Sequence, residues 1–186
     1  MPATAQTTDY LLQEGYDLKI EGTSNVRDWD AVAESMEGIL KLRNFEGMDL
    51  SDLTADRFES LEIRIPVDDL QSDGRRLTNN VHDYLEKDDH PVITFRLQEI
   101  TGLEQSEGNA EAVLTANGTI RAAGNDHTTD LQVHVQSTPD NGLRFFGSRE
   151  LKMTDFDIDP PRAMMGTIRA VDELTVHFDV TFKPES

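Results

Sequence analysis

The 186-residue sequence contains no cysteine and few basic residues. Without cysteine the chain forms no disulfide, and cysteine usage says nothing about its redox compartment. Only 17 Lys and Arg stand against 36 Asp and Glu, which gives a formal net charge of −19. A nucleic acid or an anionic lipid surface calls for a basic protein surface, so we expect neither as a partner.

Long apolar runs are also absent. No stretch reaches the roughly 20 apolar residues of a transmembrane helix, so the sequence predicts no membrane span. The N-terminal MPATAQTTDY has neither the charged region nor the apolar region of a signal peptide. Two interpretations of the compartment stay open: a cytoplasmic protein, or an exported protein whose leader has been removed.

The acidic residues are spread along the chain rather than gathered in one tail, which is typical of a solvated surface. Asp outnumbers Glu, and Arg outnumbers Lys. We predict a host that lives in high salt, where counterions screen the self-repulsion of such a surface. An acidic surface in an ordinary, low-salt host is the alternative.

Alternation of apolar and polar residues is the dominant pattern. It is clearest from Leu174 to Phe182, where every second residue is apolar. Side chains point alternately to the two faces of a strand, so each such segment has one dry face and one wet face. The pattern predicts an all-β chain of about eight strands with hairpin connections and one short helix at about residues 78–86.

Antiparallel strands with one dry face must close into a sandwich or a barrel, and periodicity alone does not choose between them. About eight strands is the size at which a barrel can hold one small ligand. A chain of this length is most economically a single domain. We expect residues 1–14 to be a loose lead-in and residues 15–184 to form the folded unit.

Motifs for catalysis or metal binding are scarce. The five histidines show neither H-x-H nor H-E-x-x-H spacing, and no nucleophile or phosphate-binding motif is present. Asp155, Asp157 and Asp159 would share one face of an extended segment, where carboxylates could serve acid–base catalysis or bind a cation. Such a triplet is expected by chance among 36 acids. The sequence therefore predicts no enzyme, no cofactor and no metal site.

Three stretches carry a resemblance. They are the turn at Gly22-Thr23-Ser24 with the segment to Trp29, the stretch VHDYLEKDDHPVITFRL, and the block LKMTDFDIDPPRAMMGTIRAVDELTVHF, and the step Gly118-Thr119-Ile120 also fits. In this order and spacing they resemble the YceI-like family of lipid-binding, lipocalin-like proteins, from about residue 10 onward.

The resemblance implies an extended antiparallel eight-stranded lipocalin-like β-barrel with one or two short helices. It implies that the interior holds a polyisoprenoid or a similar long amphipathic lipid, with an isoprenoid quinone as one such ligand. It also implies export to the periplasm, as in many relatives, and often a homodimer.

A lipid carrier needs a dry tube rather than a reactive group, because each buried methylene contributes roughly 0.8 kcal/mol. A stiff apolar loop is expected at the rim, where Pro160-Pro161 precedes Met164 and Met165, whose thioethers adapt to variable ligands. By residue type and alternation, the predicted lining is Ile63, Ile65, Phe95, Leu97, Phe156, Ile158, Met164, Met165, Val176 and Phe178.

The sequence thus favours a non-enzymatic binding or carrier protein whose partner is an apolar lipid. Two alternatives are retained. A barrel filled by its own side chains would act as a stress-related interaction module. A hydrolase or isomerase would use the carboxylates between Asp155 and Asp159.

Overall fold

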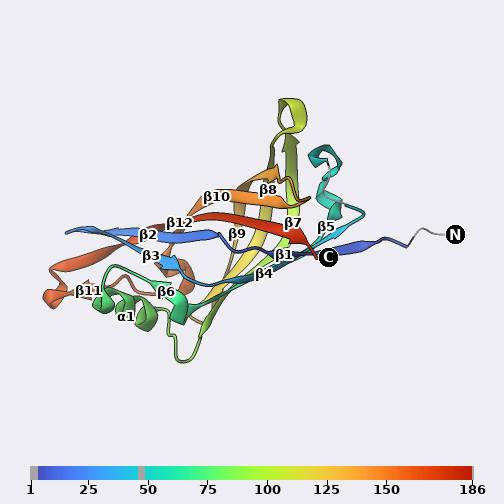
Figure 1. The fold of residues 1–186 in the computed structure, drawn as a ribbon. Helices are drawn as coiled ribbons and strands as arrows, with labels where there is room; N and C mark the ends of the chain where they lie inside the picture. The colour runs from blue at the N-terminus through green and yellow to red at the C-terminus, as the bar shows by residue number, and fades with distance from the viewer. Residues whose placement is uncertain (1–3, 46–48, 186) are drawn as a thin grey trace.

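A computed structural model describes residues 4–45 and 49–185 and shows a β-barrel that is extended at one end (Figure 1). The strands are β1 (Thr7–Leu12), β2 (Asp17–Ser24), β3 (Asp28–Ala33), β4 (Glu37–Arg43), β5 (Phe58–Pro66), β6 (Leu70–Gln71), β7 (Val92–Gln105), β8 (Ala112–Ala122), β9 (Asn125–Ser137), β10 (Leu143–Lys152), β11 (Arg162–Ala163) and β12 (Ile168–Pro184). The helix is α1 (Arg75–Tyr84), and the 3-10 turns are η1 (Leu50–Asp52), η2 (Ala55–Arg57), η3 (Val67–Asp69), η4 (Glu107–Asn109), η5 (Met153–Phe156) and η6 (Met164–Gly166).

The barrel closes in the order β1-β4-β5-β7-β8-β9-β10-β12, with β12 pairing back onto β1. Every pairing is antiparallel, which confirms the predicted eight-stranded antiparallel barrel. At 17 residues, β12 is long enough to pair with β1 near Phe182 and with β2 near Phe178. Beyond that point β2, β3 and β6 continue the sheet past the barrel, beside α1 (Figure 1).

The lead-in expected over residues 1–14 is wrong for Thr7–Leu12, which form β1 and close the barrel. Tyr10 is fully buried there, and its hydroxyl donates to the carbonyl oxygen of Phe45 at 3.3 Å. Small threonines beside a single aromatic give a weak alternation, so the strand was missed. Residues 1–3 lie outside the described part of the chain.

The helix is confirmed, but it begins three residues earlier than expected, at Arg75 after Gly74. Gly74 has a φ of +89°, which a glycine adopts without strain and which turns the chain into the helix. Thr78 lies inside the helix, and its hydroxyl accepts from the backbone N–H of Ser72 at 2.9 Å. No helix in the described residues has the length and apolar character needed to cross a bilayer.

The buried apolar side chains form one large cluster and one small one. The part of the first around Tyr10, Leu40 and Leu143, which are fully buried, is here called the packed end. The second, here called the split end, is smaller; its buried members are Ala122, Leu151 and Phe156. Most of the apolar side chains around the second cluster are only partly buried, which directs attention to the space between them.

Candidate ligand-binding cavity

The barrel encloses a cavity of about 220 Å³. Side chains from β2, β5, β7, β8, β9, β10 and β12 border it, and among the described residues all are apolar except Thr94 and Arg149. An engineered cavity of roughly 150 Å³ with leucine, isoleucine and phenylalanine walls stays dry and takes up benzene. A larger space with the same kind of wall is therefore suited to hydrocarbon.

The structure brings together eight of the ten residues that were predicted to line the interior. They are Ile63, Ile65, Phe95, Leu97, Phe156, Ile158, Val176 and Phe178. Several of them point inward yet are only half-buried, because they face the cavity rather than packed neighbours. Their contact with a ligand stays a prediction.

Sequence reasoning missed further lining residues, among them Ile20, Ile93, Ile120 and Leu131. Each lies on the inward face of an alternating strand, so the signal was present in the same period-2 pattern. The polar Arg149 was missed for a different reason: a charged residue on an inward position breaks that pattern.

Small residues on β8 make room for the cavity. Gly118 pairs with Leu97 of the neighbouring β7, and the ring of Phe95 lies directly over it. A Cβ atom on Gly118 would be 2.4 Å from Cε2 of Phe95, so any larger residue must displace the ring. Ala116 and Ala122 continue the same inward row. The glycine and alanines thus set how far the β7 side chains lie from the barrel centre.

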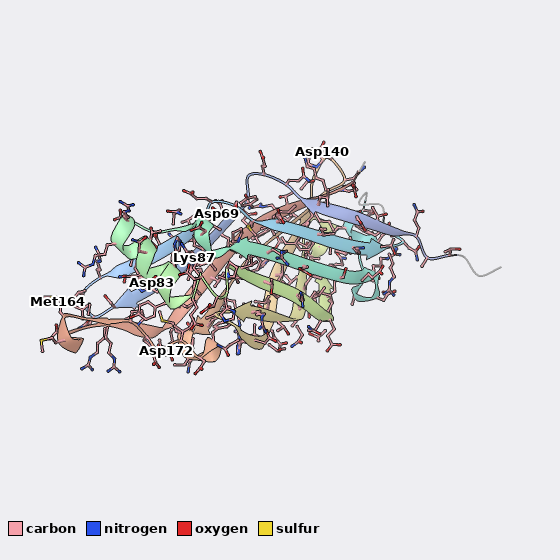
Figure 2. The ribbon with its side chains drawn as sticks, turned by 90° about the horizontal axis from the view of Figure 1, so that it is seen from below. Asp69, Asp83, Lys87, Asp140, Met164 and Asp172 are labelled. Atoms are coloured by element: carbon pink, nitrogen blue, oxygen red, sulfur yellow. The ribbon has the colours of Figure 1, made fainter. Side chains whose placement is uncertain are left out.

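Met164 and Met165 do not lie in the cavity, and their predicted place in its lining is wrong. They are 70% and 105% exposed, and Figure 2 shows Met164 at one extremity of the molecule. The reason is a short hairpin. Because Arg162 and Ala163 pair with Arg169 and Ile168, the methionines occupy the turn that projects from the barrel instead of folding over its mouth.

The backbone pairing between β9 and β10 is short. Only four residue pairs join these strands, ending at Phe146 and His134, whereas eleven pairs join β8 to β9 and ten join β10 to β12. Beyond His134, side chains bridge the gap. Asn125 donates to the carbonyl oxygen of Phe156 at 2.8 Å, and Arg149 donates to the hydroxyl of Thr129. The stretch beyond His134, where β9 and β10 do not pair, is here called the seam. It lies at the split end, beside the cavity.

The three carboxylates considered for catalysis do not share a face. Residues Met153–Phe156 form the 3-10 turn η5, and Asp157 has a φ of +57°, so the segment is not extended. Asp155 accepts a hydrogen bond from the backbone N–H of Lys152 at 3.0 Å and lies 3.6 Å from His127. No group of three His, Asp or Glu that could hold a metal occurs in the described ranges.

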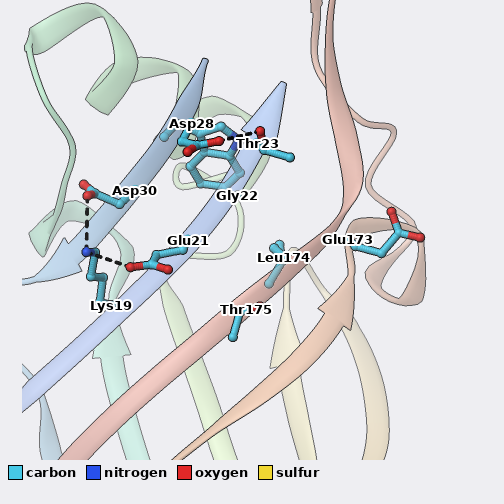
Figure 3. Close-up of a pocket in the computed structure, with 10 residues that line it drawn as sticks. Lys19, Glu21, Gly22, Thr23, Asp28, Asp30, Glu173, Leu174 and Thr175 are labelled. Carbon is cyan, nitrogen blue, oxygen red and sulfur yellow. Dashed lines mark hydrogen bonds and ion pairs between the residues drawn. The ribbon is translucent and has the colours of Figure 1, made fainter. Parts of the chain in front are cut away.

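A second, shallower depression of about 490 Å³ lies where β2, β3 and β12 extend past the barrel (Figure 3). Lys19 lies 2.7 Å from Glu21 and 3.6 Å from Asp30, and its hydrogen bond lowers the pKa of the Glu21 carboxyl. The indole of Trp29 covers Gly22, where a Cβ atom would lie 2.2 Å from the ring. Lys19, Glu21 and Asp30 pair with one another, so this depression is a weaker candidate than the apolar cavity.

Comparisons with known proteins agree with the fold. The family profile described as a YceI-like domain matches residues 16–182. A search of curated proteins found no relative of this chain. The solved structure of a polyisoprenoid binding domain from Saccharophagus degradans, implicated in plant cell wall breakdown, is 12% identical, covers 97% of this chain and 100% of its own, and has a TM-score of 0.69.

Two further solved structures are similar. BcnA from Burkholderia cenocepacia is 17% identical over 89% of this chain and 95% of its own, with a TM-score of 0.65. The YceI protein of Campylobacter jejuni is 15% identical over 83% of each chain, with a TM-score of 0.55. At these identities the likeness concerns the fold.

Proposed function

Because this chain belongs to the YceI-like family, we propose that it is a non-enzymatic carrier that holds a long-chain amphipathic lipid inside its barrel. The observation that carries the proposal is the dry cavity of about 220 Å³ in the middle of the fold. A polyisoprenoid is the favoured ligand class, and an isoprenoid quinone is one member of it.

Physical chemistry supports this assignment. A hydrocarbon chain gains roughly 0.8 kcal/mol for each methylene that leaves water, so an apolar tube binds it without a metal or a catalytic base. The Saccharophagus degradans structure, which bears the description polyisoprenoid binding, has the same fold. A long chain needs more room than the cavity offers, so the half-buried side chains around it would have to move apart on binding.

The first test is native mass spectrometry of the protein after mild purification, followed by titration with farnesol as a neutral isoprenoid probe. We expect a co-purified apolar mass, or uptake of farnesol by the apo protein. A clean apo mass together with no uptake would overturn the proposal and favour a barrel without a ligand.

A matched pair of variants links uptake to the cavity. Ala116→Phe places a ring in the cavity, whereas Ala163→Phe places the same ring at an exposed position in β11. We expect Ala116→Phe to lose farnesol binding and Ala163→Phe to keep it. Overpacking costs about 1–3 kcal/mol, so thermal melting of both variants must first show a folded protein. Equal binding by both variants would place the ligand elsewhere.

We further propose that the protein is exported to the periplasm and forms a homodimer, as the family resemblance suggests. The net charge of −19 supports a high-salt host. Cell fractionation checks the compartment, and light scattering after size-exclusion chromatography checks the dimer. Melting temperature measured against salt concentration checks the host, because screening of self-repulsion should stabilise the fold.

A further inference from the structure

The lining of the cavity contains a single charged side chain among the described residues, Arg149 on β10. It occupies the inward row of β10, in line with Phe145 and Leu151, at the height where β9 and β10 have parted. Its aliphatic stem borders the cavity, whose surface is wholly apolar, and the residue as a whole is exposed to solvent. Arg149 therefore lies between the apolar cavity and the seam.

The guanidinium is held in place but not neutralised. Its Nε and Nη2 atoms donate to the hydroxyl of Thr129 at 3.1 and 2.9 Å, and Thr129 is only 6% exposed. An arginine has five N–H donors, so three are left for another acceptor. Arg149 has no carboxylate within 4.0 Å in the part of the chain that the structure describes, although acids outnumber bases by 36 to 17. Five arginines have carboxylate partners, namely Arg43, Arg64, Arg96, Arg121 and Arg144, and Arg149 differs from the other unpaired arginines of the described residues in bordering the cavity.

The row of β9 that faces Arg149 changes character at the same level. Val135, Val133 and Leu131 give way to Thr129 and then to His127 along the inward face. The polar side chains therefore gather at the split end, where an amphipathic molecule with its chain in the cavity would place its head.

We propose that Arg149, oriented by Thr129, binds an anionic headgroup, either a phosphate or a carboxylate, of a lipid whose chain occupies the cavity. This inference rests on the proposed carrier function and adds a preference for acidic lipids over neutral ones of the same chain. Arginine is suited to the task because its planar fork of N–H groups matches both phosphate and carboxylate oxygens, and hydrogen bonds between ions are stronger than those between neutral groups.

Calorimetric titration with two matched pairs of probes tests the headgroup. Farnesyl phosphate is compared with farnesol, and palmitate with hexadecanol, so that each pair differs in the head alone. We expect the apo protein to bind at least one anionic probe about tenfold more tightly than its neutral partner. The pair that shows the preference identifies phosphate or carboxylate. Ionic strength is held constant, because the net charge of −19 repels anions.

Two variants assign the preference to Arg149. In Arg149→Gln the ratio of anionic to neutral affinity should fall to less than about threefold, and continued uptake of farnesol would show that the cavity is intact. Arg121→Gln removes one positive charge near the same end, from an exposed ion pair with Asp126 on the outer face, and should keep the full preference. Arg149→Lys should keep part of it.

The outcomes separate the two proposals. If Arg149→Gln keeps the full preference, or if the wild-type protein binds acidic and neutral probes equally, the headgroup site is wrong and the carrier function stands. If the wild-type protein takes up none of the four probes, the carrier function itself fails and the headgroup site fails with it.

Discussion

Arg144 and Arg149 lie on the same strand, five residues apart, yet they belong to different ends of the barrel. At the packed end, Arg144 faces outward and joins three strands: it donates to both carboxylate oxygens of Asp179 on β12 and to Gln136 on β9. At the split end, Arg149 faces inward, and its partner is the hydroxyl of Thr129. The strand pairing differs in the same way, because β9 and β10 pair at the packed end and part at the split end.

In the proposed carrier, the packed end would stabilise the fold and the split end would bind the ligand. At the packed end β9 and β10 pair, Tyr10, Leu40 and Leu143 are fully buried, and Arg144 hydrogen-bonds to both neighbouring strands on the outer face. The split end has half-buried side chains around a cavity and a polar seam. Tight packing leaves no space for a ligand, so a carrier needs one region that folds the chain and another that stays loose enough to receive the guest.

The largest expected change in stability comes from replacing one leucine at each end by alanine. Leu40→Ala opens a hole in the packed end and should cost about 2–5 kcal/mol of unfolding free energy. Leu174→Ala, beside the cavity, should cost less than about 2 kcal/mol, because Leu174 already borders empty space. Urea denaturation of both variants measures the pair. Equal costs would mean that the split end is packed as tightly as the other.

A glycine pair sharpens the comparison within the cavity wall. Gly118→Ala forces the ring of Phe95 away from β8, which should cost about 1–3 kcal/mol and weaken farnesol binding about tenfold as the ring enters the cavity. Gly102→Ala on β7 meets only Thr115 at 3.5 Å, an ordinary contact, and should leave both quantities unchanged. Denaturation and calorimetry give the two readings. Normal affinity in Gly118→Ala would show that Phe95 does not control the space.

The ion pair between Arg144 and Asp179 gives the packed end a smaller, acid-sensitive contribution to stability. The hydrogen bonds from Arg144 lower the pKa of the Asp179 carboxyl below its ordinary value of 3.8. A carboxyl with a lowered pKa in the folded state contributes stability above its ordinary pKa, and that contribution is lost as the pH falls through the lowered value. The pair is partly exposed, so Asp179→Asn should remove only about 0.5–1 kcal/mol at neutral pH.

The same variant should also lose stability less steeply than the wild-type protein as the pH falls below 3.8. Thermal melting between neutral and acidic pH checks both points. Arg64→Gln is the control, because Arg64 and Glu62 form a single long contact of 3.5 Å on the exposed surface. If the melting temperatures of Asp179→Asn and the wild-type protein fell in parallel with pH, the ion pair would not contribute in this way.

The strands and most of the lining were predictable, because strand alternation assigns a face to each residue, and the resemblance to the YceI-like family implied the barrel. Ile63, Phe95 and Val176 were assigned in this way, and all three border the cavity. Two features escaped. The end of the pairing between β9 and β10 depends on contacts between residues far apart in the sequence, which no local pattern reports. Arg149 breaks the alternation of apolar and polar residues, and its position is explained only by its partner Thr129. Loop side chains have no period, so the placement of Met164 depended on residue type alone.

The smallest effect is expected at those methionines, and its smallness is informative. Met164→Ser combined with Met165→Ser changes two large apolar side chains that are 70% and 105% exposed, so the free energy of unfolding should change by less than about 0.5 kcal/mol. Farnesol affinity should not change either, because neither side chain borders the cavity. Ile63→Ser and Val176→Ser are the contrast, since both do border it, and they should weaken binding. A loss of affinity in the double methionine variant would mean that the β11–β12 hairpin folds over the ligand.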